Sequence, residues 1–209
     1  MLDAPRPSST PDAWQGGWWQ GARHCPSPNF GPRPEGMPIT LAVVHSISLP
    51  PGQYGGPHIE QLFTNRLDGS EHPYFEQIRG LEVSSHFVIR RDGEVVQFVS
   101  VLDRAWHAGA SSWRGLSNCN HHSVGIELEG LEGQTFEPPQ YQALVKLIWA
   151  LNQRWPVHLV AGHEHIAPGR KADPGPGFDW RWLRTHLRWP EQAFPMANDL
   201  PDQTSPKVQ

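Results

Sequence analysis

The chain has 209 residues and a formal net charge of −4, so it lacks the strongly basic surface that binds nucleic acid or anionic lipid. This length is enough for one well-buried domain and too short for two ordinary ones. No run of about eighteen apolar residues occurs, which predicts that no segment spans a membrane. We expect a monomer whose partner is a small molecule.

Both ends of the chain are rich in proline, serine and aspartate. We therefore expect flexible tails at residues 1–13 and 191–209, around a single domain at residues 14–190. The first residues have neither the basic nor the apolar region of a secretory signal. With only two cysteines, Cys25 and Cys119, this pattern favours a cytoplasmic protein with reduced thiols, while a bridge between the two remains an alternative.

The first clear strand is predicted from Ile39 to Ser48, an apolar and β-branched run typical of a strand buried on both faces. His45 lies near its C-terminal end, shortly before the turn-forming residues 50–52. Sheets of α/β proteins present functional groups at such ends, so His45 is a candidate metal ligand. The alternative is a core histidine bonded to backbone.

A β-hairpin is predicted next, because two alternating apolar segments, 84–90 and 94–100, flank the turn-forming pair Asp92-Gly93. His86 alternates with apolar residues in this hairpin, and we interpret it as structural. The residues that follow, 104–109, read Arg-Ala-Trp-His-Ala-Gly. Their small side chains let a ligand approach the backbone, which predicts the wall of a groove.

The segment from Ser123 to Gly130 alternates strictly between apolar and other residues, which predicts a strand. Alternation places Glu127 and Glu129 together on the face opposite the core residues. Two carboxylates on one face are candidates for a general acid or base, and a solvated strand face is the alternative.

Two helices follow from apolar residues at helical spacing. The longer is predicted from Pro138 to Trp155, and the last from Trp180 to Trp189, ended by Pro190. Strands that alternate with helices predict an α/β fold, a single domain with a central mixed β-sheet flanked by helices.

Between the two helices, residues 157–160 predict a short strand and the proline- and glycine-rich residues 161–176 predict a rigid loop. His163 and Asp173 lie ten residues apart in this loop, and they can meet at one metal ion if it folds back. A catalytic zinc ion needs a third protein ligand from elsewhere. An Asx-turn carboxylate and a surface histidine are the alternative.

Three separated motifs recur together in one known family. They are the strand-end histidine followed by Ser-Ile-Ser-Leu-Pro-Pro-Gly, the strand Gly-Ile-Glu-Leu-Glu-Gly, and the loop Gly-His…Ile-Ala-Pro-Gly-Arg-Lys-Ala-Asp-Pro-Gly. In joint order and spacing they resemble the type-2 N-acetylmuramoyl-L-alanine amidases, whose fold is shared with peptidoglycan-recognition proteins. The resemblance covers roughly residues 18–189 and is greatest to the members that act on 1,6-anhydromuropeptides in cytoplasmic peptidoglycan recycling.

The resemblance implies a zinc ion held by His45, His163 and Asp173. It further implies that Glu127, rather than Glu129, is the general base and that Lys171 stabilises the oxyanion when the muramyl lactyl amide is cleaved from L-alanine. The residues implied to contact the anhydromuropeptide are Ser46, Trp106, His107 and Ala108.

Several positions depart from the family pattern. Glu82 and Asn118 stand where arginines that help to hold the acidic stem peptide are usual, so the preferred stem peptide stays open. Ser46 replaces the usual asparagine, and Glu164-His165 replaces Cys-Asp or Ser-Asp. His165 is therefore a further candidate ligand.

Two other functions within the family remain alternatives. A non-catalytic muropeptide-binding module should lack one of the ligands or the acid–lysine pair. An amidase of intact peptidoglycan should carry a signal peptide or a wall-binding repeat. A zinc protease is disfavoured because no His-Glu-x-x-His helix occurs.

Overall fold

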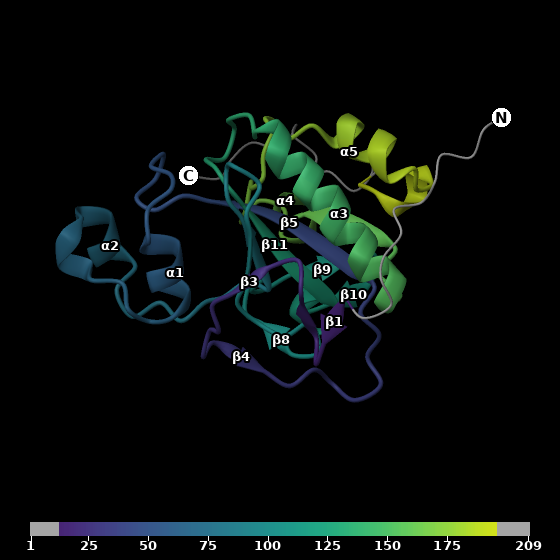
Figure 1. The fold of residues 1–209 in the computed structure, drawn as a ribbon, viewed down its shortest axis with the longest axis horizontal. Helices are drawn as coiled ribbons and strands as arrows, with labels where there is room; N and C mark the ends of the chain where they lie inside the picture. Colours follow the sequence, from purple (N-terminus) through teal and green to yellow (C-terminus); the bar gives the residue numbers. More distant parts are fainter. Residues whose placement is uncertain (1–12, 196–209) are drawn as a thin grey trace.

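The structure, a computed structural model, describes residues 13–195, and its centre is a six-stranded mixed sheet (Figure 1). The strand order is β12-β5-β11-β6-β7-β3. The first four of these strands are mutually parallel, β7 is antiparallel to β6, and β3 is parallel to β7. Their bounds are β3 Arg23–His24, β5 Leu41–Ile47, β6 Phe87–Ile89, β7 Val95–Gln97, β11 Ser123–Glu129 and β12 Leu159–Gly162.

Three two-stranded pairs lie beside this sheet, β1 with β2, β4 with β8, and β9 with β10. Their bounds are β1 Trp14–Gln15, β2 Trp18–Trp19, β4 Phe30–Gly31, β8 Arg104–Ala105, β9 Ser112–Trp113 and β10 Leu116–Ser117. The α-helices are α1 His58–Phe63, α2 Pro73–Gln77, α3 Pro138–Arg154, α4 His163–Ile166 and α5 Trp180–Leu187. Short 3-10 turns occur at Gly69–Glu71, Cys119–His121 and Glu191–Ala193.

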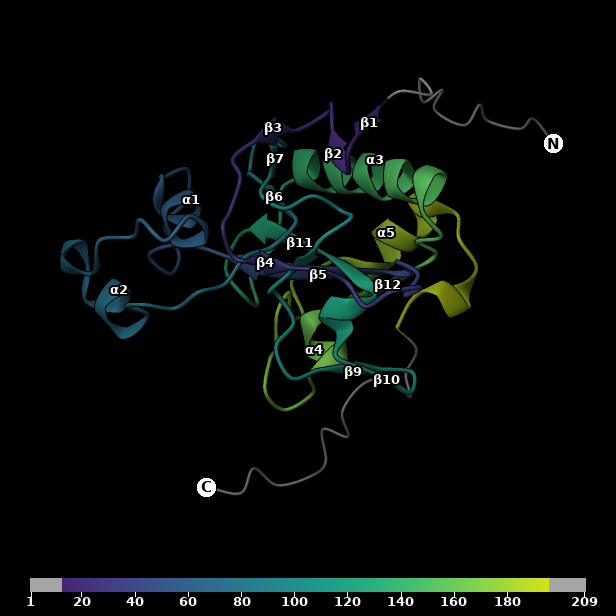
Figure 2. The ribbon, with the colours of Figure 1, turned by 90° about the horizontal axis from the view of Figure 1, so that it is seen from below.

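The main core lies between the sheet and helices α3 and α5, which cover the same face (Figure 2). Helix α3 begins with two prolines, and Gln140 Oε1 accepts a hydrogen bond from Glu137 N at its start. Its apolar stripe, which includes Leu144, Ile148 and Leu151, is completely buried. None of the helices within residues 13–195 has the length and apolar character that crossing a bilayer requires.

The opposite face of the sheet carries α4, β9 and β10, with two smaller apolar clusters (Figure 2). One of these clusters joins α1 and α2 to the hairpin β6–β7. Helices α1 and α2 project to one side of the sheet (Figure 1). They form a separate wall at the carboxyl ends of the parallel strands.

Most predicted elements are confirmed, with shifted ends. Strand β12 starts and ends two residues later than predicted. Helix α5 ends at Leu187 because Arg188 adopts a left-handed φ of 55°, before Pro190 is reached. The solvated second face considered for the Ser123–Gly130 strand is wrong, since every residue of β11 is buried.

The predicted flexible tails are partly wrong. The segment 191–195, assigned by sequence to a flexible tail, packs onto the domain, because Ala193 and Phe194 are buried in the main core. Ala13, also assigned to a tail, packs against the main core and accepts a hydrogen bond from Gln20 N at 2.9 Å. Residues 1–12 and 196–209, the rest of the predicted tails, lie outside the described residues. The thiols of Cys25 and Cys119 are both free, so they form no bridge.

Candidate metal centre and active site

Three side chains from separate elements converge at the carboxyl end of β5. His45 is on β5, His163 opens α4 directly after β12, and Asp173 lies in the loop that follows. Because β12 pairs with β5, the residue that directly follows β12 lies close to the carboxyl end of β5. The loop folds back because Glu164 N donates a hydrogen bond to the Asp173 carbonyl at 2.9 Å. Gly162 allows this packing, since a Cβ there would lie 2.8 Å from Pro174 Cδ.

The ligand atoms of these three residues lie within 4.8 Å of one another. The Nδ1 atoms of His45 and His163 are 2.9 Å apart, and each lies 3.2 Å from Asp173 Oδ2. Two imidazole nitrogens and a carboxylate oxygen are the donor types that zinc accepts at catalytic sites with an open position. The residues therefore fit a zinc ion, and the sequence-predicted ligands are brought together.

Electrostatics favour the protonation states that metal ligands require. Burial, together with the neighbouring His163, lowers the pKa of His45 to about 4, so His45 is neutral at pH 7. Burial opposes ionisation of Asp173, but its close interactions with His163 and His45 outweigh burial and hold its pKa well below the usual range. The cluster thus offers lone pairs and one negative charge.

His165, the further candidate ligand, does not join the cluster. Helix α4 places side chains two residues apart on nearly opposite sides, so His163 and His165 diverge. His165 Nδ1 instead accepts a hydrogen bond from Gly162 N at 3.0 Å.

Glu127 and Glu129 share one face of β11 and have different surroundings. In the parallel pairing, Glu127 is directly opposite His45, which places its carboxylate beside the ligands. Burial and the charge of Asp173 raise the pKa of Glu127 well above its usual value, and Lys171 opposes them. Within residues 13–195, no group makes a hydrogen bond to the Glu127 carboxylate.

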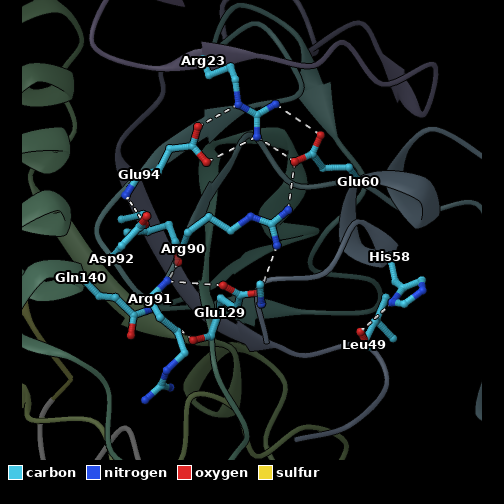
Figure 3. A network of polar contacts seen from close by, with 12 residues as sticks. Arg23, Leu49, His58, Glu60, Arg90, Arg91, Asp92, Glu94, Glu129 and Gln140 are labelled. Carbon is cyan, nitrogen blue, oxygen red and sulfur yellow. Dashed lines mark hydrogen bonds and ion pairs between the residues drawn. The ribbon is translucent and has the colours of Figure 1, made fainter. Parts of the chain in front are cut away.

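Glu129, in contrast, belongs to a fully paired network (Figure 3). It accepts from Arg90 Nη1 at 3.0 Å and from Gly55 N at 2.7 Å. Arg90 also bonds to Glu60 on α1, and Glu60 pairs with Arg23 on β3 (Figure 3). The network ties α1 and the loop before it to the sheet, so Glu129 holds the wall of the site.

A cavity of about 1260 Å³ opens above the cluster. Its lining includes the three candidate ligands, Glu127 and Lys171, and three of the four predicted substrate contacts, Ser46, Trp106 and His107. The fourth, Ala108, is completely buried in an apolar cluster with Leu41 and Val43. Exposed Glu82 follows the lining residue Leu81. Asn118 has a left-handed φ of 54° and contacts His121.

One wall of the cavity was not anticipated from sequence. It consists of apolar and aromatic residues from α1, α2 and the segment after α2, namely Leu62, Phe63, Tyr74, Ile78, Leu81 and Val83. The position of this wall over the site depends on the Arg90–Glu129 network, which joins residues far apart in the sequence. Helical periodicity in so few residues carries no signal about which surface they will cover.

Glu164, on the cavity wall, leads to a pH-dependent prediction. Burial, followed by the charges of Asp173 and Glu132, raises its pKa from 4.5 to about 7. The folded protein therefore holds this proton more tightly than the unfolded chain, and the free energy of unfolding falls as pH rises from 4.5 through about 7. We expect metal-free Glu164→Gln to be more stable than the parent at pH 8, by roughly 1 kcal/mol after solvent screening.

Urea unfolding of the two proteins at pH 8 and pH 5 measures this difference. Most of it should vanish at pH 5, where the folded parent protein keeps Glu164 protonated. Equal midpoints at pH 8 would show that ionised Glu164 is not destabilising.

Comparison with known proteins agrees with this geometry. The profile of the N-acetylmuramoyl-L-alanine amidase family matches residues 35–176. The 1,6-anhydro-N-acetylmuramyl-L-alanine amidase AmpD of Citrobacter freundii is 51% identical over 170 residues, which cover 80% of this chain and 91% of the relative.

Solved structures agree as well. A crystal structure of a selenomethionine derivative of AmpD superimposes with a TM-score of 0.81 at 49% identity, covering 83% of this chain and 98% of the other. The structure of the amidase AmiD of Escherichia coli, in complex with the substrate anhydro-N-acetylmuramic acid-L-Ala-D-γ-Glu-L-Lys, superimposes with a TM-score of 0.53 at 30% identity. This match covers 73% of this chain and 59% of the other. Two histidines, an aspartate and a buried glutamate meet at one cavity, and all four lie within the residues that the family profile matches. The chain therefore belongs to the N-acetylmuramoyl-L-alanine amidase family.

Proposed function

We propose that the protein is a zinc-dependent amidase that hydrolyses the amide bond between the N-acetylmuramyl group and L-alanine in 1,6-anhydromuropeptides. The observation that carries the proposal is the convergence of the His45, His163 and Asp173 ligand atoms within 4.8 Å, beside a buried carboxylate, in a chain of the amidase family. The three side chains would hold the zinc ion. When bound, zinc acts as a Lewis acid and lowers the pKa of water toward ~7.

Glu127 is assigned as the proton carrier. Its carboxylate lies next to the ligands, has no protein hydrogen-bond partner within residues 13–195, and has a raised pKa, so it can hold a proton between two steps. It accepts a proton from the water whose oxygen attacks the amide carbon. It then returns that proton to the nitrogen of L-alanine as the carbon–nitrogen bond breaks. The products are a lactyl carboxylate and the protonated amine of L-alanine, which carries both protons of the water.

Lys171 is assigned as the group that stabilises negative charge on the amide oxygen. It lines the cavity two residues before Asp173, and its charge acts on both Glu127 and His45. We expect Lys171→Ala to lower kcat by about a hundred- to a thousandfold, as loss of an oxyanion donor typically does. Steady-state kinetics with zinc content measured in parallel checks this. Lys171→Arg, which keeps the charge, should recover part of the rate, and an Ala variant with parental kcat would exclude the role.

The choice of substrate is supported by the relatives and by the cavity. The AmpD relatives are named for the 1,6-anhydro-N-acetylmuramyl-L-alanine bond, and the AmiD complex contains an anhydromuropeptide. The apolar wall of α1 and α2 offers a surface for a sugar ring, on which CH groups can pack. The free thiols of Cys25 and Cys119 support a reducing compartment, so we place the reaction in cytoplasmic peptidoglycan recycling.

The decisive experiment incubates the purified protein with anhydromuropeptides and, separately, with intact peptidoglycan, with and without a chelator. We expect release of the stem peptide from the anhydromuropeptides, read by mass spectrometry, and loss of this activity on chelation with recovery after zinc is added. Cleavage of intact peptidoglycan at a similar rate would favour the wall-hydrolase alternative. Binding of muropeptide without cleavage would favour a non-catalytic module, and turnover by metal-free protein would refute the metal mechanism.

A further inference from the structure

We propose that two adjacent residues, His107 and Ala108, form a platform that fixes the proton positions of both histidine ligands. The inference rests on the proposed metal site. It gives His107 a positioning role, where the sequence suggested a substrate contact. The platform lies on the segment after β8 and reaches His45 with a side-chain nitrogen and His163 with a backbone carbonyl.

A chain of hydrogen bonds runs from the Cys119 carbonyl through Ser123 and His107 to His45. The direction of every bond in it follows from the carbonyl, which can only accept. The Cys119 carbonyl has no proton, so the Ser123 hydroxyl donates to it across 2.6 Å. With its one proton used, Ser123 Oγ accepts from His107 Nε2 at 3.1 Å. Neutral His107 then has a lone pair on Nδ1, which accepts from His45 Nε2 at 2.9 Å. His45 consequently presents the lone pair of Nδ1.

His163 is oriented by the next residue of the same platform. Its Nε2 lies 3.2 Å from the Ala108 carbonyl oxygen, which can only accept, so the His163 proton is on Nε2. The same carbonyl accepts from Arg170 Nη2 at 2.6 Å, and this bond holds the carbonyl in its orientation. His163 Nδ1 is therefore also a lone pair, and it faces His45 Nδ1 at 2.9 Å. Both ligands offer the nitrogen that a metal needs.

The platform itself is held from three sides. Asn120 Oδ1 accepts from the backbone N–H groups of both His107 and Ala108, at 3.2 and 2.9 Å. Gly125 on β11 leaves room for the imidazole, because a Cβ there would lie 2.4 Å from the His107 ring. Half-buried Arg33 donates to the Ser123 carbonyl at 2.8 Å and so fixes the strand that carries the hydroxyl. Outer-shell contacts of this kind orient metal ligands and select their tautomers.

Long-range proton–nitrogen correlation spectra of the imidazoles test the proton positions directly. We expect His107 to carry its proton on Nε2 in the metal-free and the zinc-loaded protein, and His45 and His163 to do so in the zinc-loaded protein. A proton on Nδ1 of His107 would overturn the proposal. The His107 tautomer is read without turnover, so a protein that binds no zinc would refute the proposed function while this measurement still decides the inference.

Zinc affinity, measured by competition with a chromophoric chelator, tests the consequence. We expect His107→Phe to bind zinc about 10- to 100-fold more weakly than the parent, and His107→Asn, which restores an acceptor near the Nδ1 position, to recover much of the loss. Ser123→Ala should also bind zinc more weakly than the parent, and it provides the test if His107→Phe does not fold.

The matched control is His86→Asn. His86 is a second buried imidazole, 5.8 Å from His107 between ring centroids, and its Nδ1 accepts from Gly125 N. Its replacement should lower thermal stability and leave zinc affinity unchanged. Parental zinc affinity in both His107→Phe and Ser123→Ala would overturn the proposal, as would an equal loss of affinity in the control.

Discussion

Replacing Asp173 with alanine should remove most of the bound zinc and abolish amide hydrolysis. Asp173 is the one carboxylate in the three-residue cluster, and its oxygen lies 3.2 Å from each histidine nitrogen. Its loss removes a ligand and the negative charge that balances the ion. Changing an outer-shell residue typically weakens metal binding ~10- to 100-fold, so loss of a direct ligand should cost more than ~100-fold.

Elemental analysis after dialysis, together with turnover of an anhydromuropeptide, measures both effects of Asp173→Ala. A suitable control is Asp179→Ala, because Asp179 caps α5 by accepting from Trp182 N in the same part of the chain. That variant should lose about 1 kcal/mol of stability and keep one zinc ion per chain. Stoichiometric zinc in Asp173→Ala would contradict the ligand set.

The second large effect is expected at Glu127, where alanine should leave zinc bound and remove turnover. The carboxylate is next to the cluster and is not among its ligands, so metal binding does not depend on it. General acid–base groups typically contribute 10²–10⁴-fold, and a loss of about that size in kcat is expected. Burial raises the Glu127 pKa, so its ionised form destabilises the fold at pH 7, and isosteric Glu127→Gln should be at least as stable as the parent.

Stopped assays of kcat, zinc content and thermal unfolding separate these three expectations for Glu127. Glu132→Gln provides a matched control, since Glu132 lines the same cavity and should keep parental turnover. If Glu127→Gln retained parental kcat, the proton carrier would have to be another group. If it lost zinc, Glu127 would act through the metal site rather than through proton transfer.

Elements with a local signal could be predicted from the sequence. Helix α3 was placed to within one residue and the β6–β7 hairpin was found from its Asp-Gly turn, because helical periodicity and turn chemistry are properties of neighbouring residues. The fold class follows from the alternation of such elements. The end of α5 was missed because the backbone of Arg188, a residue without a strong preference for positive φ, decides it.

Only part of the candidate site could be predicted from the sequence. A histidine and an aspartate ten residues apart are equally compatible with an Asx turn, and His45 is 118 residues away from His163. The set of three came from a resemblance between motifs. In the structure, the pairing of β12 with β5 and the backbone bond from Glu164 to Asp173 bring the three together.

By itself, the sequence determined the longer strands and helices, the family and the residue types available for chemistry. Only the tertiary structure decided that both faces of β11 are buried, that Glu129 is paired while Glu127 faces the cavity, and that His107 lies against His45. The reason is physical: burial, pKa values and hydrogen-bond direction depend on which distant groups become neighbours. Periodicity records only which way a side chain points along its own strand or helix.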